Sequence, residues 1–108
     1  MEVIRYITES GKDVFGEWLA NLNDLRAAAK IIVRIDRLAA GNLGDCKSLR
    51  DGVWELRIDW GPGYRVYYAM SGRTRVLLLC GGDKRKQAAD IKRAVDYWKD
   101  YQRRMSKS

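Results

Sequence analysis

A change in hydrophobic periodicity near residue 53 most strongly restricts what this chain can fold into. In residues 53–60 (VWELRIDW), tryptophan, leucine and isoleucine occupy alternate positions, which is typical of a half-buried β-strand. The turn-forming sequence Gly-Pro-Gly follows at 61–63, and two further apolar segments cover 64–70 and 73–81. The second half of the chain therefore predicts an antiparallel β-meander over residues 53–81.

The rest of the chain predicts one strand and three helices. Residues 2–7 are rich in β-branched and aromatic types, as in a strand. Residues 13–41 have the three-and-four spacing of two amphipathic helices, and their alanines predict close packing as a hairpin. The same spacing returns over 86–104. The expected fold is therefore α+β, in one domain over 1–108 with the order β-α-α-β-β-β-α: a curved antiparallel sheet packed against an N-terminal helical hairpin, with a C-terminal helix.

The register of the first hairpin follows from burying one apolar face. A three-residue turn at 61–63 places Asp59 opposite Arg65 and Arg57 opposite Tyr67. One face should then meet the helices, and its members are Leu56, Ile58, Val66 and Tyr68. The other face should lie away from the core, and it carries Glu55, Arg57, Asp59, Arg65 and Tyr67.

The charge is unevenly distributed and predominantly positive. The formal net charge is +7, with −2 on residues 1–29 and +9 on the remainder. A balance of this kind indicates a polyanionic partner: a nucleic acid, an anionic membrane surface or an acidic protein. Arginines and a tyrosine on one sheet face suit RNA, since guanidinium groups bind phosphate and aromatic rings stack on bases. The alternative is a solvated face with cross-strand ion pairs, such as Asp59 with Arg65.

The chain contains no histidine, which removes several classes of catalytic site. Ser–His–Asp triads, Cys–His pairs, two-histidine ribonucleases and nearly all histidine–zinc sites are excluded. The two cysteines, Cys46 and Cys80, form neither a disulfide framework nor a zinc spacing. The N-terminus lacks the pattern of a signal peptide, and the longest apolar run is far too short to span a membrane. We expect a cytoplasmic protein.

A basic tripeptide lies where the last strand meets the last helix. Lys84, Arg85 and Lys86 are consecutive there. Helix N-termini bind phosphate through free N–H groups and the helix dipole, and adjacent cations strengthen that attraction.

Three segments of the chain are similar to a known family: Phe15 with Glu-Trp-Leu at 17–19, residues 34–68, and residues 77–98. They resemble the RelE/ParE toxin superfamily, most closely its HigB-like branch of addiction module killer proteins. The ordered run GVWELRID, GYRVYY, GGDK carries most of the resemblance, which covers nearly the whole chain. It implies two helices on one side of a curved antiparallel sheet.

The resemblance also implies an activity. Relatives that cleave messenger RNA in the ribosomal A site use basic residues on the sheet and at the last turn, which here correspond by position to Arg57, Arg65, and Lys84 or Arg85. The implied reaction is attack of a 2′-hydroxyl on the neighbouring phosphate, leaving a cyclic phosphate. Arg65 and Arg85 would stabilise charge on phosphorus, and Lys84 would neutralise the leaving 5′-oxygen.

The general base is left open. Some relatives place a tyrosine where this chain has Ile91, and an aspartate in this region can take part in the HigB-like branch, so Asp90 is a candidate. Glu55 is a second candidate, and Tyr67 could act as an acid or stack on a base. The residues expected to contact RNA are Glu55, Tyr67, Lys47 and Lys86.

The resemblance implies the toxin of a type II toxin–antitoxin system that needs neither a metal nor another cofactor. Its partners would be the ribosome, messenger RNA and a cognate antitoxin, expected to be a helix-turn-helix, HigA-like protein through which the complex binds operator DNA. Two alternatives remain: a ParE-like inhibitor of DNA gyrase, and an RNA-binding module without catalytic activity.

Overall fold

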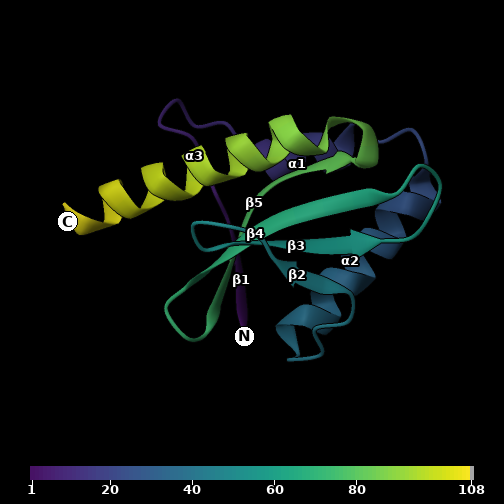
Figure 1. The fold of residues 1–108 in the computed structure, drawn as a ribbon, viewed down its shortest axis with the longest axis horizontal. Coiled ribbons are helices and arrows are strands. Elements are labelled where there is room, and N and C mark those ends of the chain that lie inside the picture. Colours follow the sequence, from purple (N-terminus) through teal and green to yellow (C-terminus); the bar gives the residue numbers. More distant parts are fainter. Residues whose placement is uncertain (108) are drawn as a thin grey trace.

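One five-stranded sheet runs through the molecule, with α2 against one face and α3 across the other (Figure 1). This computed structural model describes residues 1–107 of the 108. In chain order the elements are β1 (Glu2–Arg5), α1 (Val14–Ala20), α2 (Leu25–Ala39), β2 (Cys46–Ser48), β3 (Val53–Ile58), β4 (Tyr64–Ser71), β5 (Arg75–Asp83), the 3-10 turn η1 (Lys84–Lys86) and α3 (Gln87–Ser106). The strand order is β1-β5-β4-β3-β2.

The predicted α+β class is confirmed, with two differences in the sheet. β1 pairs with β5 in parallel, so the sheet is mixed and not antiparallel throughout. β2 is an additional edge strand, paired antiparallel with β3. The sequence could not indicate either feature, because four residues of strand do not specify a pairing direction and three are too few to show alternation.

The register of β3 with β4 differs from the expected one by two residues. Arg57 pairs with Arg65 and Glu55 pairs with Tyr67, and the connection covers residues 59–63. The expected pairs were wrong, but the expected faces were right. A shift of two residues leaves every side chain on its own side of the sheet, since side chains alternate with a period of two.

The longer connection follows from contacts of Trp60 outside the sheet. Its indole N–H donates to the Asp24 carboxylate, at 3.0 Å, and Asp24 is the N-cap of α2. The Lys30 ammonium lies 4.5 Å from the centre of a Trp60 ring. These contacts hold Trp60 against α2, so that β3 ends at Ile58 and does not continue to residue 60.

Each face of the sheet has its own apolar core. The face that was expected to meet the helices does so, with Leu56, Ile58, Val66 and Tyr68 packed against α2. The opposite face was expected to lie away from the core, and this was wrong for most of its length. α3 covers it, and the Tyr67 side chain is fully buried there. A β-bulge between Tyr67 and Tyr68 of β4 and the facing part of β5 turns both Leu79 and Cys80 into this second core.

The two N-terminal helices do not form the close pair that their alanines suggested. α1 packs principally against β5. Its neighbouring residues Val14 and Phe15 enter the α3 core and the α2 core respectively. Ala27 of α2 faces the sheet and is fully buried there. Small side chains therefore allow α2 to approach the sheet closely.

Two glycines at the end of β5 allow helices to approach the sheet. A Cβ atom on Gly81 would overlap the Trp18 ring of α1, and one on Gly82 would overlap Oδ2 of Asp90 in α3. β5 continues through both glycines to Asp83. Along residues 1–107, no helix has the length and apolar character needed to cross a membrane.

Gly81→Ala is expected to lower the free energy of unfolding by about 1–3 kcal/mol, because the new methyl group overlaps the Trp18 ring. Urea unfolding followed by circular dichroism measures the change. When Trp18 is first replaced by leucine, Gly81→Ala should lower the free energy of unfolding by less, because the ring that the methyl group overlaps is absent. The two single variants and the double variant form a double-mutant cycle. Equal stability of Gly81→Ala and the wild type would mean that this contact does not restrict the packing of α1.

Candidate functional site

A polar cleft opens where the β3–β4 turn meets η1, at one end of the sheet. Its volume is about 310 Å³. The residues that line it are Asp45, Arg57, Asp59, Gly61, Pro62, Gly63, Arg65 and Lys84. We call it the arginine cleft. It lies on the α3 side of the sheet, beyond the point at which α3 begins, so this corner of the face stays uncovered.

Two arginines form one wall of the arginine cleft. Arg57 and Arg65 are direct partners across β3 and β4, so their side chains leave the same face at neighbouring positions. Two like charges at such positions repel each other unless an anion lies between them. The Glu55 carboxylate supplies one: its Oε1 lies 3.7 Å from Nε of Arg57 and 3.6 Å from Nε of Arg65.

The Glu55 side chain is only 1% exposed, so its charge needs partners inside the protein. Besides the two arginines, the Gln87 side chain donates a hydrogen bond to Oε2 of Glu55, at 2.9 Å. Gln87 is the first residue of α3. The carboxylate therefore connects β3, β4 and α3 beneath the cleft. Glu55 was expected as an RNA contact on an open face; its burial contradicts that placement and makes it a support for the arginines.

The other wall is formed by Lys84 and two acidic residues. The backbone N–H of Lys84 donates to the Gly63 carbonyl, at 2.9 Å, which holds η1 against the β3–β4 turn. Asp45 pairs with the Arg57 guanidinium, at 3.1 Å. Asp59 makes no ion pair with any residue of 1–107, so the expected Asp59–Arg65 pair is absent. The two-residue change in register explains this.

The remaining basic residues of the last turn lie in a different hollow, which we call the η1 hollow. Its volume is about 230 Å³, and its lining consists of Trp18, Gly81, Gly82, Asp83, Arg85, Lys86, Asp90 and Arg93. The Arg85 side chain is 81% exposed, and its guanidinium group pairs with Asp83 at 2.8 Å. Arg85 holds the pKa of Asp83 below its usual range through this hydrogen bond. Lys84 and Arg85 are adjacent in sequence but line different hollows: Lys84 lines the arginine cleft, and Arg85 lines the η1 hollow.

Asp90 is an aspartate buried at the base of the η1 hollow. It is 5% exposed, and its Oδ2 atom has no hydrogen-bond partner. Arg93 lies 3.8 Å from the other carboxylate oxygen. Burial raises the pKa of Asp90, and the attraction of Arg93 and Lys86 only partly opposes it. Such an under-compensated carboxylate in a hollow is typical of functional sites.

Two expected RNA contacts lie elsewhere. Tyr67 is fully buried under α3, and burial raises the pKa of its phenol, with the Glu55 charge acting in the same direction. Its ring cannot stack on a base in this structure. Lys47 is exposed on the edge strand β2, opposite Glu55 in the register and outside both hollows.

Arg57, Arg65 and Lys84, which the resemblance implied as site residues, all line the arginine cleft, but three further residues near it were not expected. Asp45 lies just before β2, and nothing in the sequence pattern marks it. Gln87 belongs to the GGDK–Q run, and its position at the start of a helix was the available signal. Arg34 reaches from α2 to the Arg57 carbonyl, at 2.8 Å, a contact that only the tertiary fold creates. No group of three or more His, Cys, Asp or Glu residues within 1–107 could hold a metal ion.

Asp90→Asn is expected to be more stable than the wild type at pH 7. Burial raises the pKa of Asp90 in the folded protein. The contribution of Asp90 to the free energy of unfolding is therefore fully present below its pKa in the unfolded chain, and it is lost as the pH rises through its pKa in the folded protein. Asparagine cannot ionise, so the variant should be more stable than the wild type only where Asp90 is charged, and the difference in stability should disappear in acid. Thermal unfolding at pH 3 and pH 7 measures it, with the exposed Asp96→Asn of the same helix as control. A destabilised Asp90→Asn protein at pH 7 would mean that the pair with Arg93 outweighs burial.

Most of the chain matches one protein family. Residues 17–98 match the family described as "Phage derived protein Gp49-like (DUF891)". An uncharacterised protein of Haemophilus influenzae is 58% identical over 80 residues, which cover 74% of this chain and 81% of the relative. The matched segment includes the three cations of the arginine cleft and both carboxylates Glu55 and Asp90. The chain belongs to the Gp49-like family, a RelE/ParE-like toxin family of addiction modules.

Proposed function

We propose that this protein is the toxin of a type II toxin–antitoxin system, of the HigB-like branch, and that it stops translation by cleaving messenger RNA on the ribosome. The family match supports the toxin assignment. The observation that carries the catalytic part is the convergence of Arg57, Arg65 and Lys84 on one cleft, above a buried carboxylate that holds both arginines. Convergent cations of this kind suit a phosphodiester.

The reaction that fits these groups is an internal transfer at phosphorus. The 2′-oxygen of one nucleotide bonds to the adjacent phosphorus, and the bond from that phosphorus to the 5′-oxygen breaks. The products are a 2′,3′-cyclic phosphate and a 5′-hydroxyl. Arg57 and Arg65 would bind the non-bridging oxygens, whose negative charge grows in the transition state, and Lys84 would give a proton to the leaving oxygen.

Asp59 is the group we assign to the 2′-hydroxyl proton. Its carboxylate lines the arginine cleft and forms no ion pair within residues 1–107, so it is available as an acceptor. Glu55 is buried and engaged by Arg57, Arg65 and Gln87, which suits positioning and not proton transfer.

Residues of the η1 hollow would hold the RNA strand next to the reacting phosphate. Arg85 and Lys86 are exposed there, and Asp90 would orient Arg93 and Lys86 from below. Lys47 would meet the strand at the edge of the sheet. In this assignment Arg85 contacts a neighbouring phosphate, since it lines the η1 hollow and not the arginine cleft.

The antitoxin would be a protein with an acidic surface, of the helix-turn-helix, HigA-like type, that covers the basic end of the toxin. Complementary charge makes such association fast. The complex would bind its operator DNA through the antitoxin, because the basic surface of the toxin would then be covered.

Arg65→Ala is expected to reduce cleavage of ribosome-bound messenger RNA by about 100- to 1000-fold, the usual loss when one charge-stabilising donor is removed. Primer extension on messages from a translation extract detects the cuts, with ribosome-free RNA run in parallel. Arg73→Ala, at the far end of β4, is the matched control, because it removes the same charge from an exposed turn. Intact messages with the wild-type protein would contradict the ribonuclease assignment, and inhibition of DNA supercoiling would then favour a ParE-like gyrase inhibitor.

Glu55→Gln tests the support beneath the arginines. The substitution keeps the shape of the side chain but removes the anion, so Arg57 and Arg65 should repel each other and leave their positions. We expect the rate at saturating RNA to fall by about 10- to 100-fold, as for a small misplacement of catalytic groups, while KM stays unchanged or falls because the protein becomes more positive. A variant with a raised KM and an unchanged kcat would show that Glu55 has no positioning role.

A further inference from the structure

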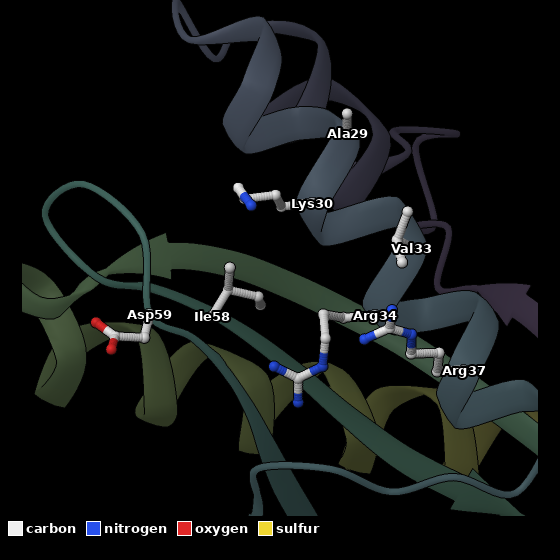
Figure 2. Close-up of a pocket in the computed structure, with 7 residues that line it drawn as sticks. All are labelled: Ala29, Lys30, Val33, Arg34, Arg37, Ile58 and Asp59. Atoms are coloured by element: carbon white, nitrogen blue, oxygen red, sulfur yellow. The ribbon is translucent and has the colours of Figure 1, made fainter.

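A third hollow lies between α2 and the end of β3, next to the arginine cleft. Its volume is about 430 Å³, and it is lined by Ala29, Lys30, Val33, Arg34, Arg37, Ile58 and Asp59. Figure 2 shows the cationic side chains projecting from α2, with Ile58 and Asp59 facing them from the sheet. We call it the α2 hollow.

The α2 hollow joins three cations to an apolar floor. Lys30, Arg34 and Arg37 follow each other at the three-and-four spacing that places them on one side of the helix. Nη2 of Arg34 is buried without a hydrogen-bond partner, and the Arg37 guanidinium has no partner within residues 1–107. The floor is apolar and consists of Ala29, Val33 and Ile58. A ligand that fits has a flat apolar part and a negative charge, which describes a nucleotide.

The α2 hollow and the arginine cleft meet at one residue, Asp59, which lines both. Nη1 of Arg34 donates to the backbone carbonyl of Arg57, whereas the Arg57 side chain lines the cleft on the other face of the sheet. A strand whose phosphate lies on Arg57 and Arg65 passes Asp59 as it leaves the cleft on this side.

We propose that the α2 hollow is a second nucleotide subsite, which binds the RNA strand beside the phosphate that reacts in the arginine cleft. This proposal rests on the proposed function. The base would lie on the apolar floor and against the guanidinium planes, and the phosphate would bind Lys30 and Arg37. An acidic protein segment would meet the same cations, but the position of Asp59 in the lining of both hollows favours the strand that already occupies the cleft.

The test compares two double variants that each remove two positive charges. Lys30→Gln/Arg37→Gln alters the α2 hollow and leaves the buried Arg34 in place. Arg73→Gln/Lys92→Gln, at exposed positions that line neither hollow, is the matched control. The probes are fluorescent 2′-O-methyl RNAs of ten and three nucleotides, which cannot be cleaved because the 2′-oxygen is blocked. Fluorescence anisotropy over a range of salt concentrations measures binding, and KM for ribosome-bound message is measured in parallel.

Lys30→Gln/Arg37→Gln is expected to bind the ten-nucleotide RNA about tenfold more weakly than the control double variant. The slope of log affinity against log salt should fall by about 1.4, about 0.7 for each lost contact with a single strand. Affinity for the three-nucleotide RNA should not differ, since that length reaches only the arginine cleft. On the ribosome the same variant should raise KM and leave kcat unchanged.

Equal affinities and equal KM values for the two double variants would overturn the subsite while leaving the proposed function intact, provided that the wild type cleaves and Arg65→Ala does not. Absence of cleavage by the wild type would instead reject the proposed function. Unchanged RNA binding by Lys30→Gln/Arg37→Gln, together with weaker binding of the antitoxin, would assign the hollow to an acidic protein segment and also overturn the subsite.

Discussion

The buried carboxylate of Glu55 is the charge on which the arrangement of this end of the molecule depends. It lies beneath two arginines that face each other across β3 and β4, and it accepts a hydrogen bond from the first residue of α3. A buried anion without partners would destabilise the fold by several kcal/mol. Each partner in turn has its position restricted by the carboxylate. One interaction therefore connects the stability of the sheet with the geometry of the arginine cleft.

α3 decides which part of the sheet can meet a ligand. It covers one face with apolar contacts from Ala94 and Val95, and it starts only beyond the corner that carries the arginines. Gly81 and Gly82 permit this arrangement, because larger residues there would collide with Trp18 and Asp90. The same short stretch of chain then turns through η1 and places Lys84 on the cleft and Arg85 on the η1 hollow. Packing and site geometry are thus set by the same few residues.

The absence of histidine agrees with the chemistry that these hollows can perform. Arginine and lysine stay charged near neutral pH and suit the stabilisation of a phosphate that gains negative charge. Among the carboxylates that could accept a proton, Asp59 and Asp90 are in different states: Asp59 is exposed and unpaired within residues 1–107, and Asp90 is buried with a raised pKa. Membership of a toxin family and a cleft of convergent cations point in the same direction, although they are independent observations.

The sequence by itself determined the α+β class and the face on which each residue of β3 and β4 lies, because both depend on hydrophobic periodicity, which a sequence records directly. The resemblance to a toxin family indicated Arg57, Arg65 and Lys84, which line the arginine cleft in the structure. Tertiary structure decided the parallel pairing of β1, the register of Arg57 with Arg65, and the burial of Glu55 and Tyr67. The register changed because Trp60 binds to the start of α2, and the face closed because α3 folds back over it. Both causes are contacts between segments far apart in the chain, and no local pattern records them.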